Sequence, residues 1–232
     1  MKVLDHGYVE FVEAWGTGYD GVGNPFDFEV GIIEAARMST GKGFESWEKD
    51  QRLLKYLYEH KHSTPFEMAG MVLEIKAPIF IFREWHRHRT QSYNEMSARY
   101  IPLPNENYLP TLERVLANEK SNKQAQGTGA VLPELQAARF ISDLQQHYTD
   151  GQDLYEEYLS YGVPKELARL CIPVGRYSRM RASANLRNWL SFLTLRLAPN
   201  AQWEIRQYAE AVGEIVKTVF PRTWELFKNE SL

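Results

Sequence analysis

Cysteine and long hydrophobic runs are almost absent from this sequence. Its 232 residues include a single cysteine, Cys171, which excludes an internal disulfide and favours a reducing compartment. No apolar stretch approaches the roughly 20 residues that a membrane-spanning helix requires, and the N-terminal residues lack the apolar core of a secretion signal. We therefore expect a cytoplasmic protein that has no membrane partner.

The chain also lacks an overall positive charge and a P-loop. A net charge of −3 argues against general nucleic-acid binding, so no nucleic-acid partner is expected. No Gly-Lys-Ser or Gly-Lys-Thr occurs, and a bound phosphate would be held by side chains. The pairs His60/His62 and His86/His88 are two residues apart, which suits neither a helical zinc site nor a zinc ribbon. No metal site is expected.

The pattern of apolar residues predicts a helix-rich chain with a small sheet, in one domain that covers residues 1–232. A hydrophobic content of 44% suffices for a substantial core, and no Pro/Gly/Ser-rich linker divides the chain. Alternating residues predict strands at 8–15 and 69–76 and indicate an Arg-rich strand at 174–183. Helical spacing, prolines and candidate caps predict helices at 27–39, 46–60, 78–89, 133–162 with a kink at Gly151, 164–173, 186–197, 201–219 and after Pro221. The Gly-rich segment up to residue 26 and the polar segment 118–129 are predicted surface loops.

The segment from Arg83 to Tyr100 concentrates most of the chemistry. It holds four arginines and two histidines together with aromatic, amide and hydroxyl side chains, a density of donors that solubility does not require. Guanidinium groups match the oxygens of phosphate and stay charged at accessible pH. The segment therefore predicts a site for a phosphate-bearing ligand with rings nearby.

The spacing within this segment resembles the signature of the flavin-dependent thymidylate synthases. That signature is Arg-His-Arg, seven residues, then Ser, and here Arg87-His88-Arg89 precedes Ser97 within Ser-Tyr-Asn-Glu-Met-Ser-Ala-Arg-Tyr. Other segments are also similar to that family: 35–39, 62–67, 166–169, 185–187 with Arg196, and 201–204. The resemblance implies an α+β fold, with helices packed around a small, mostly antiparallel sheet. It also implies a homotetramer whose active sites are shared between subunits.

The same resemblance implies reductive methylation of dUMP to dTMP. FAD would be the cofactor, NADPH the reductant and 5,10-methylenetetrahydrofolate the one-carbon donor. No cysteine of the protein would act as a nucleophile.

Carried over position by position, the resemblance assigns three groups of site residues. The FAD-binding group is Ser39, Thr64, Glu67, Arg87, His88, Arg89, Glu95, Asn185, Arg187 and Ser191. The dUMP-binding group is Glu84, Trp85, His86, Arg87, Glu95, Met96, Ser97, Ala98, Arg99, Arg169 and Arg196. The catalytic group is Arg196, which would polarise a uracil carbonyl, Ser97, which would position the nucleotide, and His62, which would help to admit the folate. Glu84, Met68 and Ser191 depart from the family's usual Gln, His and Asn.

Other interpretations of these residues stay open from the sequence. The segment 83–100 could be a charged helix end whose arginines pair with Glu84 and Glu95. The protein could instead bind single-stranded nucleic acid by stacking, or bind flavin or nucleotide without turnover. Cys171 lies between Leu170 and Ile172 and is expected to be a buried core thiol. Ser97 is the alternative nucleophile, but no adjacent base is recognisable.

Overall fold

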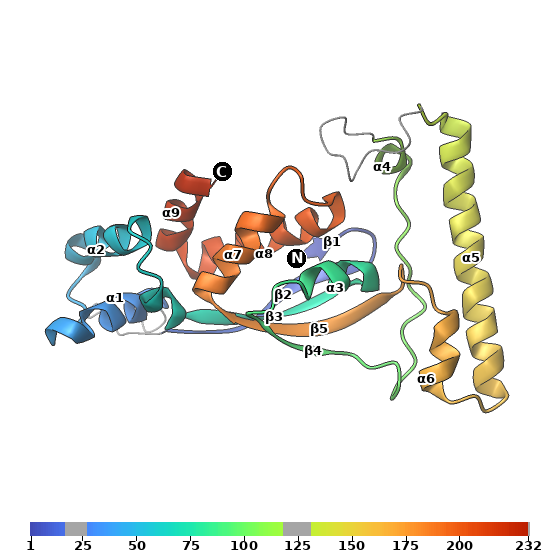
Figure 1. Cartoon of the computed structure of the whole chain (residues 1–232), viewed down its shortest axis with the longest axis horizontal. Helices are drawn as coiled ribbons and strands as arrows, with labels where there is room; N and C mark the ends of the chain where they lie inside the picture. Colours follow the sequence, from blue (N-terminus) through green and yellow to red (C-terminus); the bar gives the residue numbers. More distant parts are fainter. Residues whose placement is uncertain (17–26, 118–130, 232) are drawn as a thin grey trace.

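A five-stranded antiparallel sheet runs through the chain in the order β1-β2-β3-β5-β4 (Figure 1). The computed structural model describes residues 1–16, 27–117 and 131–231, with side chains up to residue 229. The strands are β1 Lys2–Val3, β2 Gly7–Trp15, β3 Gly70–Pro78, β4 Ser92–Glu95 and β5 Tyr177–Asn185. The predicted α+β class and antiparallel sheet are thus confirmed. Apart from residue 16, the two predicted surface loops, at 16–26 and 118–129, lie outside the described residues.

The central strand β3 shows why the sheet has one buried face. Met71, Leu73 and Ile75 alternate along it and are fully buried, while the residues between them are half-buried. On β5 the same alternation leaves Arg179 and Arg181 exposed on the opposite face. Hydrophobic burial therefore fixes the register, because a shift by one residue would turn these arginines into the core.

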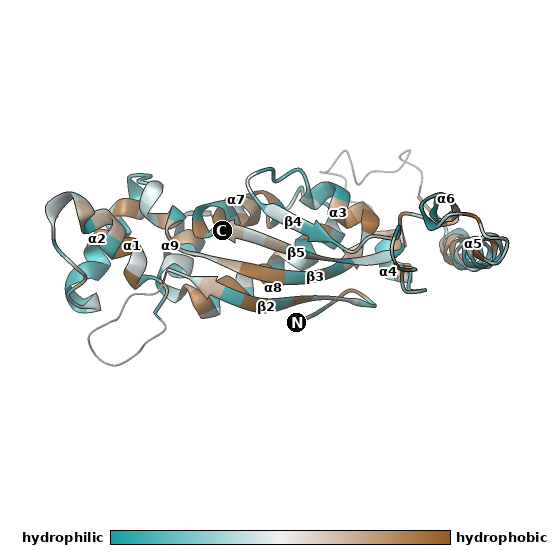
Figure 2. Cartoon of the chain, turned by 90° about the horizontal axis from the view of Figure 1, so that it is seen from below, coloured by the Kyte–Doolittle hydropathy of each residue, from teal (hydrophilic) through white to brown (hydrophobic). Residues whose placement is uncertain are grey.

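Three helices cover the apolar face, α3 Ile79–Trp85, α7 Leu186–Arg196 and α8 Trp203–Val219, and a fourth, α9 Pro221–Ser231, packs on α8. Trp85 and Trp189 are fully buried among them, and the ring of Phe192 stacks on that of Trp85 at 4.5 Å. None of the described helices lies on the opposite face of the sheet. Figure 2 shows the molecule from that side. The sheet thus has a packed side and an open, charged side.

The remaining helices lie at the two ends of the sheet (Figure 1). One end carries α1 Val30–Arg37 and α2 Trp47–Glu59, with short 3-10 turns at Met38–Thr40 and Thr64–Glu67. The other end carries α4 Leu112–Leu116, the long α5 Glu134–Ser160, α6 Lys165–Ala168 and a 3-10 turn at Arg169–Cys171. The predicted kink at Gly151 is not observed as a break, because α5 continues through it. A β-carbon there would meet the carbonyl oxygen of Cys171 at 2.9 Å, so packing explains the glycine.

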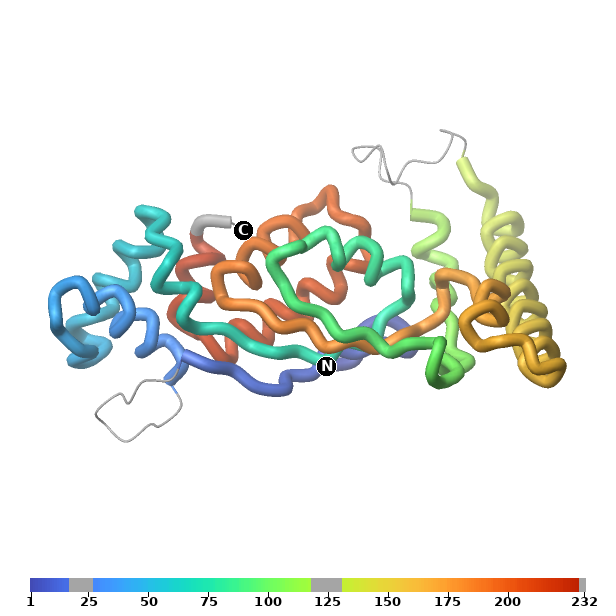
Figure 3. The backbone as a smooth tube through the Cα atoms, turned by 60° about the horizontal axis from the view of Figure 1, so that its bottom comes forward, coloured from blue at the N-terminus to red at the C-terminus, as the bar shows by residue number. Residues whose placement is uncertain are grey.

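The prediction that a helix extends from Pro78 to Arg89 is wrong at its C-terminal end. Helix α3 ends at Trp85, where side chains bond the carbonyl oxygens of its last turn. Arg196 Nη2 donates to the oxygen of Glu84 at 2.9 Å, and the single hydroxyl proton of Tyr93 is shared between the oxygens of Trp85 (3.1 Å) and His88 (2.7 Å), the latter beyond the helix. Burial raises the pKa of Tyr93 to about 12, so this hydroxyl remains a donor. Strand β4 follows in a segment for which no strand was predicted, and it pairs with β5. In Figure 3 the green segment after α3 runs beside the orange tube of β5.

In the described residues, no helix is long and apolar enough to cross a membrane. The same residues contain no group of three or more His, Cys, Asp or Glu that could hold a metal ion.

Candidate active site

The Arg87-His88-Arg89 motif forms a turn between α3 and β4. Backbone N–H groups of Arg87 and His88 donate to the oxygens of Glu84 and Trp85, which tightens the chain after the helix. The indole of Trp85 donates to Gln91 Oε1 at 3.1 Å and fixes the far side of the turn. The side chain of Trp85, a predicted dUMP ligand, therefore belongs to the core. The motif is rigidly held although it lies outside regular structure.

His88 points inward from this turn, between α3 and α7. Its side chain is 9% exposed, its ring lies edge-on to Phe192 at 4.9 Å, and its Nε2 accepts the Nε–H of Arg196 at 2.9 Å. Burial, and then the charge of Arg196, lowers the pKa of His88 to about 4. The imidazole is therefore neutral at pH 7, with its proton on Nδ1.

The pH dependence of stability should report this buried imidazole. The pKa of His88 is about 4 in the fold against 6.5 for the free side chain. Between these two pH values the imidazole is therefore protonated in the unfolded chain and neutral in the folded chain. Stability should fall as pH drops from about 6.5 to about 4, by up to about 3 kcal/mol from this group. Urea unfolding across this range should show a weaker dependence for His88→Gln, whereas the exposed His147→Gln should match wild type. Identical slopes for both variants would contradict the buried, neutral state.

Arg196 ends α7 and reaches across to the end of α3. Its Nη1 donates to Glu84 Oε2 at 2.7 Å and its Nη2 to the carbonyl oxygen of Glu84 at 2.9 Å. With the bond to His88, three of the five guanidinium N–H groups are engaged. Glu84 is half-buried and is the carboxylate partner of Arg196.

The two arginines of the motif and the nearby Arg83 remain available to an anion. Arg83, Arg87 and Arg89 are exposed, and none of them takes part in an ion pair within the described chain. The alternative of a charged helix end neutralised by Glu84 and Glu95 does not hold for the described residues. Glu84 pairs with Arg196, and Glu95 is exposed on β4 without an ion pair.

A cavity of about 490 Å³ opens beside the outer end of the sheet, between α3, β4 and the turn at 169–171. Of the predicted site residues, His86, Glu95, Met96, Ala98 and Arg169 line it. The sequence analysis did not assign Arg83 or Ser178, which also line the cavity. The i, i+3 spacing of Arg83, in the last turn of α3, and His86, the C-cap residue of that helix, could have revealed the first. Ser178 is buried in β5 and its hydroxyl has no partner among the described residues, a property that only the fold reveals.

Ser97 and Arg99 flank this cavity without lining it. The backbone N–H of Arg99 donates to Ser97 Oγ at 3.3 Å, and no hydrogen bond in the described chain joins that oxygen to a histidine or carboxylate. Arg99 Nε lies 3.3 Å from Glu166 Oε2, with both side chains more than half exposed. An exposed pair of this kind contributes little, about 0–1 kcal/mol, so a phosphate could displace it.

A second group of predicted residues gathers at the other end of β5. His62, Arg187 and Ser191 line a cavity of about 140 Å³ together with Phe66 and Thr194. Glu67 forms an ion pair with Arg187, and Thr64 is exposed in the same 3-10 turn as Glu67.

Asn185 and Ser39 complete this second group. Asn185 caps α7, since its Oδ1 accepts the N–H of Asn188 at 3.0 Å. Ser39 lies in the 3-10 turn after α1, and its hydroxyl, on the surface, donates to Ala36 O at 3.3 Å.

The sheet sets the distance between the two groups. Glu95 pairs with Met180 on β5, and Asn185 lies five residues further along the strand. At roughly 3.3 Å per residue the two groups are about 17 Å apart. The Arg-His-Arg turn follows α3, on the face of the sheet that the helices cover. The structure therefore places two groups of charged and polar residues at opposite ends of β5, each beside a cavity.

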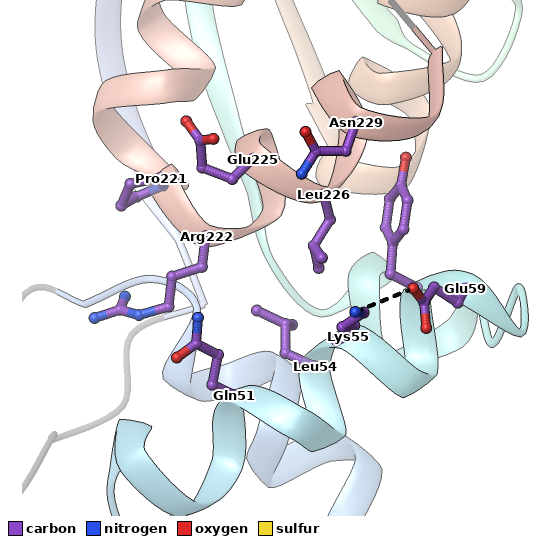
Figure 4. Close-up of a pocket in the computed structure, with 10 residues that line it drawn as sticks. Gln51, Leu54, Lys55, Glu59, Pro221, Arg222, Glu225, Leu226 and Asn229 are labelled. Carbon is purple, nitrogen blue, oxygen red and sulfur yellow. Dashed lines mark ion pairs between the residues drawn. The ribbon is translucent and has the colours of Figure 1, made fainter.

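Two other features do not belong to this arrangement. Gly16-x-Gly18-x-x-Gly21 has the spacing of a dinucleotide-binding loop, but β2 is antiparallel to β3 and α1 begins only at Val30. Residues 17–26 lie outside the described part of the chain. A groove of about 770 Å³ lies between α2 and α9, with Leu54 and Leu226 inside it and the Lys55–Glu59 pair on its rim (Figure 4). None of the predicted site residues lines that groove.

The expectation of a buried core thiol is wrong for Cys171. The residue is half-exposed in the turn at 169–171, and the neighbouring Leu170 is 79% exposed. The apolar sequence around Cys171 indicated burial, but this turn lies between α6 and β5 at the edge of the molecule. Cys171 does not line the 490 Å³ cavity, although both of its neighbours do.

Comparison with known proteins finds similarity over the whole chain. The family described as "Thymidylate synthase complementing protein" matches residues 26–222. The chain is 41% identical to a flavin-dependent thymidylate synthase of Thermus thermophilus, covering 100% of this chain and 79% of that protein. It is 37% identical to the enzyme of the same name from Thermotoga neapolitana, covering 98% and 93%. The crystal structure of a UMP/dUMP methylase, PolB from Streptomyces cacaoi, bound with 5-Br UMP superposes with a TM-score of 0.81 at 28% identity, covering 100% of this chain and 97% of that one.

Proposed function

The chain belongs to the flavin-dependent thymidylate synthase family, and from this premise we propose that it converts dUMP to dTMP by reductive methylation. The proposal names FAD as cofactor, NADPH as reductant and 5,10-methylenetetrahydrofolate as the source of the one-carbon unit. The observation that carries it is the 490 Å³ cavity, whose cationic residues lie next to the exposed arginines of the motif.

The nucleotide would occupy this cavity. A nucleoside monophosphate is close to dianionic, and Arg83 from α3 and Arg169 from the turn at 169–171 supply forked donors to the space. Each charge-assisted hydrogen bond contributes about 1.5–3 kcal/mol where water is excluded. Arg99 lies at the rim, and Ser97 holds the backbone of Arg99 in place through its hydroxyl oxygen. Ser97 is therefore a positioning residue in this proposal.

Arg196 would act on the uracil ring. Transfer of a methylene group to C5 requires negative charge to build up on the ring, and a preorganised guanidinium beside a carbonyl oxygen stabilises that charge. Two N–H groups of Arg196 have no acceptor among the described residues. These two donors can therefore face the carbonyl without breaking an existing bond.

The flavin would bind across the second group of residues and the motif turn. Arg87 and Arg89 are exposed and have no ion pair among the described residues, so they fit its phosphates. The small cavity with His62, Arg187 and Ser191 fits the edge of a ring. Bound FAD, once reduced, would supply the hydride that completes the methyl group. His62 is exposed at the mouth of that cavity, where the folate would enter.

The proposal assigns no nucleophilic role to the protein's thiol. Cys171 is half-exposed and lies outside the nucleotide cavity, so Cys171→Ala should change kcat by less than about twofold. Steady-state assay of dTMP formation measures this directly. A folded Cys171→Ala variant without activity would contradict the cysteine-free route.

Assembly as a homotetramer with shared sites is also part of the proposal. Large apolar side chains around the cavity are exposed in the single chain: Tyr100 at 73%, Leu167 at 54%, Leu170 at 79% and Val174 at 56%. Exposed apolar patches that are surrounded by polar residues mark protein–protein interfaces, so these side chains are candidates for contacts between subunits. Light scattering gives the mass in solution, and a stable monomer with full activity would contradict this part.

The function is tested by flavin absorbance and turnover together. Purified protein should have the visible spectrum of a flavin. It should also release the C5 hydrogen of dUMP to solvent when NADPH and methylenetetrahydrofolate are present, with UMP assayed in parallel. A yellow protein that releases no C5 hydrogen from either nucleotide would overturn the proposal.

A further inference from the structure

The guanidinium of Arg196 is held by acceptors that differ in how far they can move. The carbonyl oxygen of Glu84 belongs to the backbone of α3, and His88 is packed against Phe192. Both are therefore fixed. The carboxylate of Glu84 is the third acceptor, at 2.7 Å, and its side chain is 32% exposed.

Together these three bonds define the plane of the guanidinium. Each of the three nitrogens of Arg196 donates once, and the two unused N–H groups, on Nη1 and Nη2, are left with a fixed direction. Fixed donors stabilise developing charge better than mobile ones, because no reorganisation is needed when the charge appears. Loss of one acceptor would free the fork to rotate.

We infer that Glu84 and His88 are positioning residues for Arg196, and that they act on the nucleotide through this arginine rather than by contacting nucleotide or flavin themselves. The inference rests on the proposed function, because it gives Arg196 a role at the uracil ring. It departs from the sequence assignments of Glu84 to dUMP and of His88 to FAD. Both side chains are already committed to Arg196 in the fold.

Acceptor geometry, rather than the charge of Glu84, is the property that matters in this arrangement. The carbonyl of a glutamine at position 84 can accept the same Nη1–H, whereas alanine cannot. Glu84→Gln should therefore rescue most of the activity that Glu84→Ala loses. A residue that merely stabilises the fold would not give this pattern at unchanged melting temperature.

A double-mutant cycle tests the inference. Glu84→Ala should lower kcat about 10- to 100-fold, with the KM for dUMP changed less than about threefold, since a misplaced catalytic group costs rate rather than binding. Glu84→Gln should stay within about threefold of wild type, and Glu214→Ala, which removes an exposed ion pair with Lys217, is the matched control. In an Arg196→Lys background Glu84→Ala should have almost no further effect, because the two act as one unit. Additive losses would overturn the inference.

Nitrogen-15 spectra of the histidine side chains provide a readout that does not depend on turnover. At pH 7, His88 should show an unprotonated Nε2 that accepts a hydrogen bond and a protonated Nδ1. A protonated Nε2 would overturn the inference even in an active enzyme. An inactive wild type would overturn the proposed function, and the role at the uracil ring with it. If the wild type is active and the activity losses of the Glu84 and Arg196 substitutions are additive, only the positioning role is overturned.

Discussion

Arg196→Ala is expected to lower kcat for dUMP methylation by about 10²–10³-fold, the usual cost of removing a preorganised donor. The reason is the position of the guanidinium: it is fixed by Glu84 and His88 and keeps two donors for the ring. FAD content should change by less than about twofold, because Arg196 lines neither cavity and its guanidinium is engaged by Glu84 and His88. Rapid-quench and steady-state assays with flavin-loaded enzyme measure the loss.

The fold of the variant has to be monitored separately. Removing Arg196 leaves Glu84 half-buried without its cation, so some loss of stability is expected as well. Arg196→Lys keeps the charge but loses the planar fork, and should also be slow. Arg139→Ala, at a side chain that is 81% exposed on α5, is the control for loss of a surface arginine. A folded Arg196→Ala enzyme within threefold of wild type would contradict the role.

Arg169→Ala and Arg187→Ala are expected to have opposite effects on the two ligands. Arg169 lines the 490 Å³ cavity, so its loss should weaken dUMP binding about 10- to 100-fold and leave FAD binding within about twofold. Arg187 lines the smaller cavity and pairs with Glu67, so its loss should release FAD and spare dUMP. Calorimetric titration of each variant with each ligand gives the four dissociation constants.

The separation of the two groups along β5 is what makes this crossed pattern a sharp test. Met180 and Asn185 place them about 17 Å apart, beyond the reach of one side chain. Equal losses of both ligands in both variants would mean that the cavities form one site, or that each arginine acts on the fold. Arg139→Ala again provides the control, with both affinities unchanged.

Elements with strong periodicity could be predicted from sequence. The alternation of Met71, Leu73 and Ile75 identified the central strand, and the apolar stripe after Pro133 identified α5. Both patterns arise from burial of one face, which is a local property of the chain. Strand β4 was missed because only pairing with β5 makes Ser92–Glu95 a strand.

The end of α3 could not be predicted because part of its cause is distant in sequence. Arg196 takes the oxygen of Glu84 from 112 residues away, and nothing near Arg87 signals this. Motif spacing alone assigned His88 to FAD. In the fold its ring is buried against Phe192 of α7, a contact that the motif does not indicate. Cys171 shows the reverse case, an apolar neighbourhood that remains at the surface.

Formation of dTMP tests the central claim most directly. Purified protein is incubated with dUMP, FAD, NADPH and methylenetetrahydrofolate. The nucleotides are then separated by chromatography and quantified by mass spectrometry. The account predicts dTMP in proportion to NADPH consumed, none when dUMP, NADPH or methylenetetrahydrofolate is omitted, and undiminished product with Cys171→Ala. Flavin-loaded protein that consumes NADPH but forms no dTMP would contradict it.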